Sequence, residues 1–141
     1  MISTKGRYAL RVMLDLAQNE EYGYIPLKDV AGRQGISKKY LEIIVRDLVK
    51  GGLIEGVSGR SGGYRLCRGP EDYTVGEVLE LMEGTLSPVA CLSDKSYNCP
   101  RSEECLTLPL WKEYEQMRRD FFYGKRLSDL LKSSQAAEIK V

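Results

Sequence analysis

Three cysteines are the residues of this sequence with the clearest capacity for metal chemistry. Cys91, Cys99 and Cys105 lie in one segment that is bounded by Pro88 and Pro109. Thiolates are soft ligands, and three of them on one segment can bind an iron–sulfur cluster, zinc or copper(I). The spacing alone does not decide between zinc and a cluster, although the Cys-x2-Cys knuckle typical of structural zinc sites is absent. A redox disulfide or three unligated thiols would fit the same spacing.

The fourth cysteine and the lack of histidine narrow the chemistry further. The 141-residue chain has four cysteines and no histidine. Cys67 follows Leu66 in a stretch expected to form a strand, and we expect its side chain to be buried as a small apolar residue. Without histidine, Ser-His-Asp and Cys-His catalysis are excluded. The sequence also lacks a Gly-Lys-Ser/Thr phosphate loop and a dinucleotide fingerprint, so we expect neither an enzyme nor a small-molecule substrate.

Charge is distributed unevenly along the chain. The net charge is only +1, but Lys and Arg outnumber Asp and Glu in residues 1–70, and the reverse holds in residues 71–141. The first half is therefore the candidate for contact with a polyanion such as DNA.

The elements that would position these charges form a helix-turn-helix followed by a hairpin. Apolar spacing predicts a first helix capped by Ser3 and Thr4, a short helix over 28–33 that ends at Gly35, and a third helix that Ser37 caps and that runs to residue 50. The third helix buries one apolar stripe, and its other face carries the polar and charged side chains Ser37, Lys38, Lys39, Glu42 and Arg46.

Glu42 is the one carboxylate on that exposed face. A carboxylate can accept a hydrogen bond from a cytosine amino group and repels phosphate, so Glu42 could act as a filter on base sequence. An ion pair with Arg46, one turn later, is at least as good an explanation of the pattern.

Two short strands, over 53–57 and 64–67, predict a wing with Arg60 at its glycine-rich tip. Arg60 can reach a minor groove or a phosphate, unless it is only a mobile surface residue. Lys5 and Arg7 lie beside the positive end of the first helix and can hold a phosphate, with hydroxyl or backbone donors from Ser3 and Thr4.

The second half predicts a connection to a partner subunit. Thr74 and Glu77 have capping-box spacing before a helix that ends at Gly84, and residues 85–107 have no clear periodicity. A long helix follows over 109–123, with the seam Leu110, Tyr114, Met117 and Phe121. Such a seam on a polar helix needs a covering surface, so we expect a homodimer whose two recognition helices are a whole number of DNA turns apart.

We therefore expect a mainly α fold with a small β-hairpin wing: a winged helix-turn-helix domain plus a long C-terminal dimerisation helix. The predicted parts are a DNA-binding domain at 1–70, a connecting helix at 71–84, a cysteine-containing cluster-binding loop at 85–108, the dimerisation helix and a short last helix at 109–132, and a polar tail at 133–141. No apolar run approaches the length of a membrane span, so we expect a cytoplasmic protein without a membrane partner.

Four motifs closely resemble the family of bacterial winged-helix regulators that includes IscR, NsrR and CymR. They are residues 3–9 (STKGRYA), 36–42 (ISKKYLE), 62–64 (GGY) and 75–78 (VGEV), within a resemblance that runs from Ile2 to about Leu131. The resemblance implies a homodimer on a pseudo-palindromic operator. It also implies that Glu42 rejects one operator class in the apo form and that Lys39 lies by the bases. Such wings commonly carry a basic residue where Ser58 stands, so base reading passes to Arg60 or is weaker. The candidate DNA-contacting residues are thus Thr4, Lys5, Ser37, Lys38, Lys39, Tyr40, Glu42 and Arg60.

The segment Cys105-Leu106-Thr107 followed by Leu110-Trp111 is similar to the cluster segment of the IscR-like members. That similarity implies a 2Fe-2S cluster on Cys91, Cys99 and Cys105. These relatives often supply a histidine three residues after the last cysteine, but Leu108 stands there, and Tyr8 stands where NsrR-like members can place an acidic ligand. The fourth ligand therefore stays open. The candidates are Asp94, Glu103, Glu104, Thr107, Glu42, Cys67, a small external thiol and water, and oxygen or external ligation would make the cluster labile.

The leading hypothesis is a transcriptional regulator, a repressor among its roles, that senses cluster status through a labile 2Fe-2S cluster and controls cluster-biogenesis genes. Cluster occupancy would alter operator choice. One alternative is a nitric oxide or thiol-redox responsive regulator of the same fold. Another is a zinc-stabilised, non-catalytic interaction module.

Overall fold

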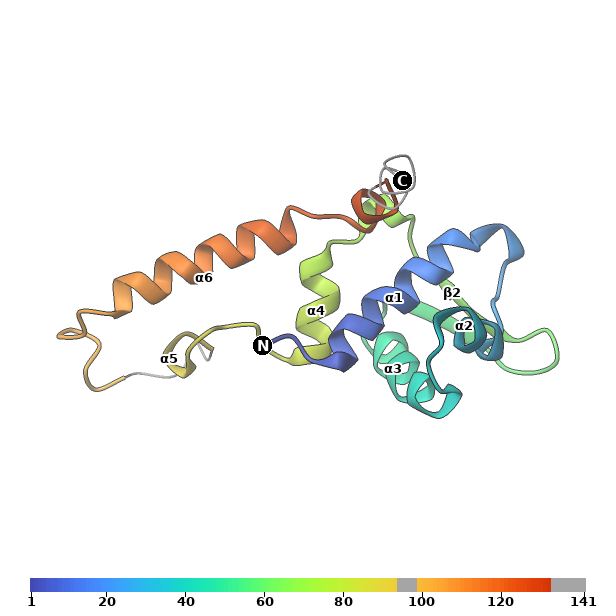
Figure 1. Ribbon diagram of the computed structural model, residues 1–141, viewed down its shortest axis with the longest axis horizontal. Coiled ribbons are helices and arrows are strands. Elements are labelled where there is room, and N and C mark those ends of the chain that lie inside the picture. The colour runs from blue at the N-terminus through green and yellow to red at the C-terminus, as the bar shows by residue number, and fades with distance from the viewer. Residues whose placement is uncertain (94–98, 133–141) are drawn as a thin grey trace.

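The computed structural model of the protein describes residues 1–93 and 99–132 (Figure 1). The predicted tail at 133–141 and the candidate ligand Asp94 lie outside these residues. The described chain is mainly helical and contains a two-stranded antiparallel hairpin, as the sequence predicts. In chain order the elements are α1 (Thr4–Gln18), η1 (Glu20–Tyr22), α2 (Leu27–Gln34), α3 (Lys38–Lys50), β1 (Ile54–Val57), β2 (Gly63–Leu66), η2 (Pro70–Asp72), α4 (Val75–Glu83), α5 (Ala90–Ser93) and α6 (Leu108–Tyr123).

Helices α2 and α3 form the predicted helix-turn-helix. Gly35 ends α2 with a positive φ of 66°, a conformation that favours glycine, and the chain then turns directly into α3. The Ser37 side chain caps α3 by accepting a hydrogen bond from the backbone N–H of Tyr40 at 3.2 Å. The predicted apolar stripe of α3 is buried (Leu41, Ile44, Val45 and Leu48), which leaves the opposite face of the helix for a ligand.

The wing is the hairpin of β1 and β2, whose register pairs Ile54 with Leu66 and Val57 with Gly63. Its boundaries differ from the predicted 53–57 and 64–67 by a single residue at three of the four ends. A third extended segment joins it, because Ile25 and Tyr64 exchange backbone hydrogen bonds of 2.8 and 2.9 Å. Gly63 lies against the backbone of Ile25 without room for a side chain. The wing is thereby attached to the residues that lead into α2.

The core lies where α1 contacts α4, α2, α3 and β2. Tyr73 is fully buried just before α4, and its hydroxyl donates a hydrogen bond to the carbonyl of Leu53 at 2.6 Å. The same hydroxyl accepts hydrogen bonds from the backbone N–H groups of Cys67 and Arg68, at 2.9 and 3.0 Å. One side chain therefore satisfies three backbone groups at the base of the wing and joins the wing to the connecting helix.

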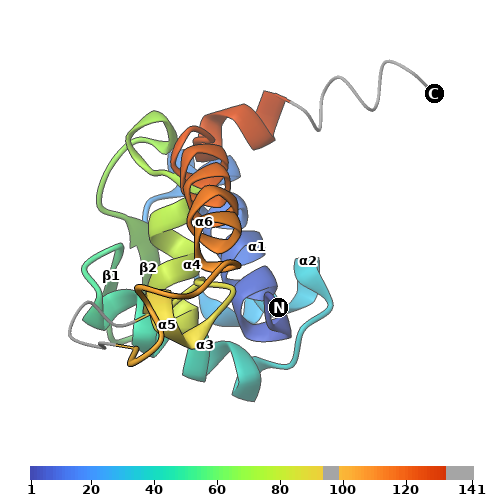
Figure 2. The same ribbon diagram turned by 90° about the vertical axis from the view of Figure 1, so that its left-hand side faces the viewer.

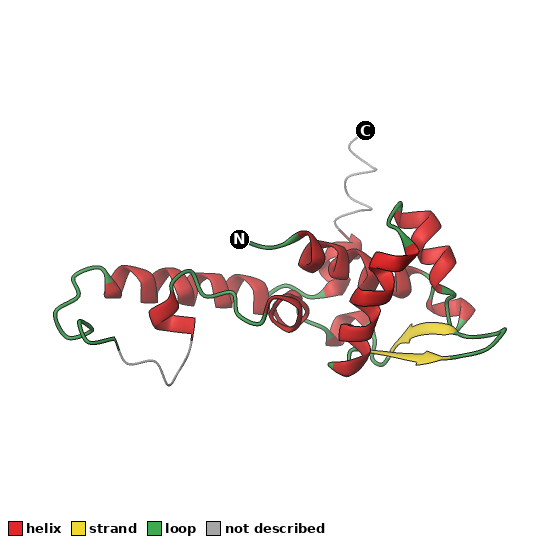
Figure 3. Cartoon of the chain, turned by 90° about the horizontal axis from the view of Figure 1, so that it is seen from below, coloured by secondary structure: helices red, strands yellow, loops and turns green. Residues whose placement is uncertain are grey.

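Helix α6 extends away from this core, as Figures 1 and 3 show. It begins at Leu108 rather than at the predicted residue 109, and Pro109 occupies its first turn. The segment from the end of α4 through α5 runs beside α6, and Figure 2 shows α6 end-on with this segment next to it. The four residues of the predicted seam, hereafter the α6 seam, are each more than half exposed in the single chain: Leu110, Tyr114, Met117 and Phe121. The predicted last helix is helical over residues 127–132.

Candidate DNA interface and cysteine site

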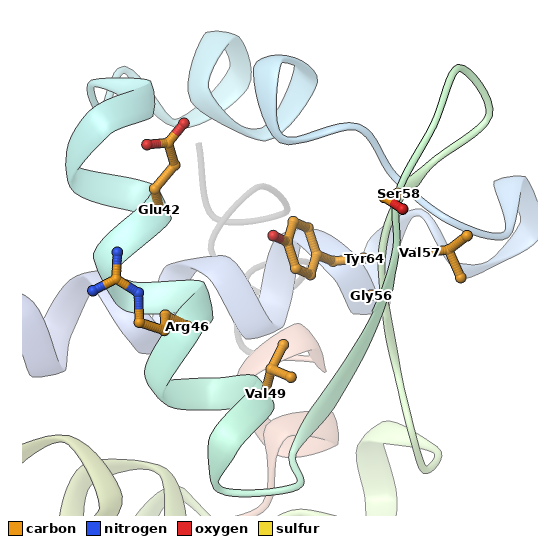
Figure 4. Close-up of a pocket in the computed structure, with 7 residues that line it drawn as sticks. All are labelled: Glu42, Arg46, Val49, Gly56, Val57, Ser58 and Tyr64. Carbon is orange, nitrogen blue, oxygen red and sulfur yellow. The ribbon is translucent and has the colours of Figure 1, made fainter.

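A hollow of about 580 Å³ separates α3 from the wing (Figure 4). Figure 4 shows Glu42 and Arg46 on the α3 side of this hollow, with Tyr64 and the wing strands on the other side. Glu42 and Arg46 form no ion pair, so the alternative explanation of Glu42 as a partner of Arg46 is not realised. Glu42 is exposed on this face of α3.

A second hollow, of about 420 Å³, lies between the start of α3 and the wing tip. Lys38, Glu42 and Arg60 all line it, so the structure brings together three residues that the sequence analysis assigned to DNA. Lys28, on α2, lines the same hollow and was not predicted. No signal in the sequence identifies it, because its place beside the wing depends on the pairing of Ile25 with Tyr64.

Several cations around this surface have no carboxylate partner. Arg33, Arg65 and Arg68 are each held in an ion pair, with Asp15, Glu55 and Glu77 respectively. By contrast, six cations on α2, α3 and the wing tip pair with no carboxylate among residues 1–93 and 99–132: Lys28, Lys38, Lys39, Arg46, Lys50 and Arg60. Unpaired cations that line one face are available to neutralise phosphates.

The other predicted DNA residues lie around this surface with different constraints. Lys39 and Ser37 are exposed at the start of α3, and Tyr40 is half-buried with its ring edge-on to Tyr8 at 5.8 Å. Lys5 forms an ion pair with Asp47 of α3, which makes it a link between two helices as well as a surface cation. Thr4 is exposed, and its hydroxyl accepts a hydrogen bond from Arg7 at 3.0 Å.

The three cysteines of the predicted cluster loop line one cavity of about 180 Å³. Ser102, Leu108 and Lys112 line it with Cys91, Cys99 and Cys105, so the structure places the predicted metal ligands around a shared space. Within residues 1–93 and 99–132, however, no three Cys, Asp or Glu side chains converge closely enough to hold a metal ion. The donor set suits a thiophilic metal centre, and the loop would have to close further to bind one.

The surroundings of Cys105 favour ionisation of its thiol. Its sulfur lies 3.4 Å from the Thr107 hydroxyl, and hydrogen bonds from that hydroxyl and from the backbone N–H groups of Thr107 and Leu108 lower the pKa of Cys105. These N–H groups belong to the start of α6, where unpaired donors stabilise a negative charge. A thiolate, the form that binds metals, is therefore favoured at Cys105.

The candidates for the fourth cluster ligand differ in their distance from the cysteine cavity. Glu103 and Glu104 are exposed and do not line the cysteine cavity, and the Thr107 hydroxyl contacts Cys105. Figures 1 and 3 place α5 and the start of α6 at the opposite end of the chain from α3 and the wing, so Glu42 and Cys67 of the same chain are remote. Ser102 and Lys112, which line the cavity, were not predicted, because nothing in their spacing distinguishes them from other surface residues.

The prediction that Cys67 is buried is wrong, because the side chain is exposed. Leu66 at the end of β2 points into the core, and strand alternation turns the next residue outward. The backbone of Cys67 is the part that is held, through the hydrogen bond to Tyr73.

A helix-turn-helix, a hairpin wing and a face of unpaired cations together define a winged-helix DNA-binding protein. The sequence profile of the Rrf2 family, described as "Iron-dependent Transcriptional regulator", matches residues 2–133. The chain belongs to the Rrf2 family.

Individual relatives agree with this assignment. The chain is 34% identical over 138 residues to the HTH-type transcriptional regulator IscR of Klebsiella pneumoniae (strain 342), covering 98% of this chain and 83% of the relative. The solved structure of T. potens IscR is similar, with a TM-score of 0.76 and 34% identity over 97% of this chain and 90% of that one. CymR (YrzC), the global cysteine regulator of B. subtilis, has a TM-score of 0.69 and 32% identity over 92% of this chain and 95% of that one.

These similarities confirm the predicted fold class, the resemblance found in the sequence, and a DNA-binding transcriptional regulator rather than an enzyme. Within the described ranges, 1–93 and 99–132, no helix has the length and apolar character needed to cross a membrane.

Proposed function

We propose that the protein is a cytoplasmic, homodimeric regulator that binds a pseudo-palindromic operator with α3 in the major groove and the wing against the adjacent backbone. The support is the surface on which Lys38, Glu42 and Arg60 meet, with unpaired cations around it. Lys39 and Arg46 extend that surface along α3. The outlying candidates Thr4, Lys5, Ser37 and Tyr40 would position the DNA backbone rather than read bases.

The proposed dimer rests on the α6 seam. Four large apolar side chains at helical spacing are exposed on a helix that projects from the core. Burying them against the same helix of a second chain would remove this apolar surface from water. A two-fold arrangement would also give two α3 helices for the two half-sites of an operator.

The sensing group that we propose is a labile 2Fe-2S cluster on Cys91, Cys99 and Cys105. Through it the protein would control cluster-biogenesis genes, as the resemblance to the IscR-like members implies. The observation that carries this proposal is that all three thiols line one cavity. The lowered pKa of Cys105 favours the thiolate that such a centre requires. When bound, the cluster supplies a group whose presence depends on the supply of iron and sulfide. The fourth position would be filled by an oxygen donor or an external ligand, because the chain has no histidine.

The connection from the cysteines to the DNA-binding face runs through α4. Cys91 follows the last residue of α4 by eight residues, and α4 packs on α1 and α3. Closing the cysteine loop would therefore act on helices that hold the recognition helix, and in this way cluster occupancy would change operator choice.

The test is the composition of protein purified without oxygen. We expect about two irons and two sulfides per chain, with visible charge-transfer absorption. Cys91→Ser should remove this absorption without unfolding the protein, whereas Cys67→Ser, at an exposed position away from the cavity, should keep it. Stoichiometric zinc, or a colourless protein after reconstitution, would contradict the cluster and leave the DNA-binding proposal standing.

A thiol-redox response is the second candidate function, and a specific observation favours it. The Cys105 thiol is activated by its hydrogen bonds at the start of α6, and a cysteine regulator is among the structural neighbours. In this case, peroxide would change operator affinity in metal-free protein, and Cys105→Ser would abolish the response. An operator affinity that follows iron supply but not peroxide would exclude this alternative.

A further inference from the structure

Tyr64 of β2 has a side chain that the hairpin holds in a fixed place between the wing and α3. The ring packs against the core, and in the hairpin register Tyr64 faces Gly56 of β1. A Cβ atom at Gly56 would lie 2.8 Å from the Tyr64 ring, so glycine there leaves the space that the ring fills. Two backbone hydrogen bonds with Ile25 hold the main chain of Tyr64. The residue is therefore held through its ring and its backbone before any ligand binds.

The hydroxyl of Tyr64 is available to a ligand. Figure 4 shows it at the end of a ring that points from the wing towards α3. The hydroxyl has no hydrogen-bond partner among residues 1–93 and 99–132. Within those ranges, Arg118 carries the only buried side-chain nitrogen or oxygen that lacks a partner, so the unpartnered oxygen of Tyr64 is accessible to solvent. It can donate its hydrogen to an acceptor that enters the space between α3 and the wing.

Tyr64 lines both hollows between α3 and the wing, and the two hollows differ in charge. Of the described residues, Arg46 and Glu42 are the charged side chains that line the first hollow. In the second hollow, three cations lie with the same Glu42: Lys28, Lys38 and Arg60. None of these three has a carboxylate partner within the described part of the chain. An anion is therefore favoured in the second hollow, where Tyr64 adds an uncharged donor.

The groups of the second hollow match a phosphate of the DNA backbone. A phosphate diester has one negative charge and two free oxygens, which can accept hydrogen bonds from several donors at once. The acceptors on a base edge are uncharged and would leave the three cations without a counter-charge. Glu42 repels a phosphate, but Figure 4 shows Glu42 on the α3 side and Tyr64 on the wing side. A phosphate beside Tyr64 is thereby kept apart from the carboxylate.

We propose that the Tyr64 hydroxyl donates a hydrogen bond to a DNA phosphate that the cations of the second hollow hold, and that this contact fixes the position of the DNA backbone against the wing. The inference rests on the proposed docking of α3 and the wing on DNA. Lysine ammonium groups act on a phosphate mainly as mobile point charges, whereas a hydroxyl on a fixed ring gives the contact a direction. Removing this hydroxyl takes no charge from the interface, which distinguishes Tyr64 from the cations around it.

The test is Tyr64→Phe in the full-length protein, on a fluorescein-labelled duplex that the wild type selects from a random library. The variant keeps the ring, and urea denaturation should show unchanged stability, because the hydroxyl has no partner in the free protein. Fluorescence anisotropy should show an affinity for the duplex that is about tenfold lower or more, since a hydrogen bond to a charged acceptor is lost. The slope of log affinity against log salt should equal that of the wild type, because no cation is removed.

Tyr24→Phe is the matched control for this variant. Tyr24 is half-buried beside β1, where its hydroxyl lies 3.4 Å from Glu55, and it lines neither hollow. This variant loses the same atom from the same residue type, and it should bind the duplex as the wild type does. An affinity of Tyr64→Phe equal to that of the wild type and of Tyr24→Phe would overturn the proposal.

Duplexes that carry a methylphosphonate at one position of each strand identify the acceptor. At the contacted position the neutral methyl group replaces a charged oxygen, and the wild type and Tyr64→Phe should then bind with nearly equal affinity. At other positions the difference of about tenfold should remain. A difference that persists at every position would overturn the phosphate assignment, because the hydroxyl would then contact a base. A wild type that binds no duplex in a salt-dependent manner would instead show that the proposed docking on DNA is itself wrong.

Discussion

Ser3 and Glu83 tie the first turn of α1 to the last residue of α4. The backbone N–H and the hydroxyl of Ser3 both donate to Oε1 of Glu83, at 2.9 and 2.6 Å, and the Ser3 oxygen also caps α1 by accepting from the N–H of Gly6 at 3.1 Å. A side chain at Gly6 would overlap the Glu83 carboxylate, so glycine at this position leaves room for the contact with Ser3. The segment that carries the cysteines begins directly after this contact.

Removal of the Glu83 carboxylate should destabilise the protein measurably. Glu83→Ala leaves the Ser3 N–H and hydroxyl without their acceptor in a half-buried position, and we expect a loss of about 1–2 kcal/mol in the free energy of unfolding. Urea denaturation of wild type and variant gives this difference. Glu21→Ala, at an exposed carboxylate of η1, is the control and should change stability by less than about 0.5 kcal/mol. Equal values for both variants would show that the Ser3 contact contributes nothing.

The hydroxyl of Tyr73 is a second point where a single atom can be tested. Tyr73→Phe keeps the buried ring but leaves the Leu53 carbonyl and the N–H groups of Cys67 and Arg68 without a partner. We expect a loss of about 1–3 kcal/mol in unfolding free energy and faster amide hydrogen exchange at the base of the wing. Tyr22→Phe, at a tyrosine that is 70% exposed, should be neutral. Slow exchange retained at Cys67 and Arg68 in Tyr73→Phe would contradict the role assigned to this hydroxyl.

Local patterns in the sequence predicted most of the fold. The helix caps at Ser37 and Thr74, the positive φ of Gly35 and the apolar stripe of α3 are set by residues close together in the chain, so their types and spacing determine them. The α6 seam was predicted in the same way, because four apolar residues at helical spacing need no knowledge of what covers them.

Contacts between distant residues could not be predicted in this way. The ion pair of Lys5 with Asp47 joins α1 to α3, and the presence of Lys28 beside Arg60 depends on how the segment at Ile25 pairs with the wing. Cys67 shows the reverse error: its residue type favours burial, but its place one residue after an inward-facing Leu66 turns it outward. Contacts between residues that are distant in the sequence determine these positions, and local sequence patterns do not reveal such contacts.

Stability should fall at alkaline pH because of Tyr123. Burial and the nearby Glu80 raise the pKa of Tyr123 to about 12. The unfolded chain, with a tyrosine pKa near about 10, releases this proton first as the pH rises. The stabilisation of the folded state by protonated Tyr123 is therefore complete below about pH 10, and it is lost as the pH rises through about 12. Tyr123→Phe should reduce the pH dependence of the unfolding free energy in this range. Part of that dependence should remain in the variant, because burial also raises the pKa of Tyr73. An unchanged alkaline slope in the variant would contradict this assignment.

The unpaired cations at the wing and on α3 predict a defined salt dependence of operator binding. Each neutralised phosphate releases counterions, so Arg60→Ala or Lys38→Ala should lower the slope of log affinity against log salt by about 1 for each phosphate that the variant leaves without its cation. Fluorescence anisotropy over a series of salt concentrations measures this slope. Arg119→Ala, a change at an α6 residue remote from the wing, serves as the control. A slope that is the same in all three variants would mean that Arg60 and Lys38 do not contact phosphate.

Glu42 should determine which operators the metal-free protein accepts. Its carboxylate lines both hollows between α3 and the wing and forms no ion pair within residues 1–93 and 99–132. DNA in the groove must therefore either donate a hydrogen bond to it or bury an unpaired negative charge beside phosphates and acceptor edges. Glu42→Ala should improve binding to operators that the wild type rejects by about tenfold or more, and change binding to accepted operators much less.

Glu42→Gln separates charge from shape in the same experiment, because it keeps the side-chain length and adds a donor. Selection from an operator library measures these preferences, with Glu55→Gln, at a wing carboxylate already paired with Arg65, as the matched control. If the library preference of Glu42→Ala equals that of the wild type, Glu42 does not filter operators, and the choice between them depends on Lys38, Arg60 or the shape of the DNA.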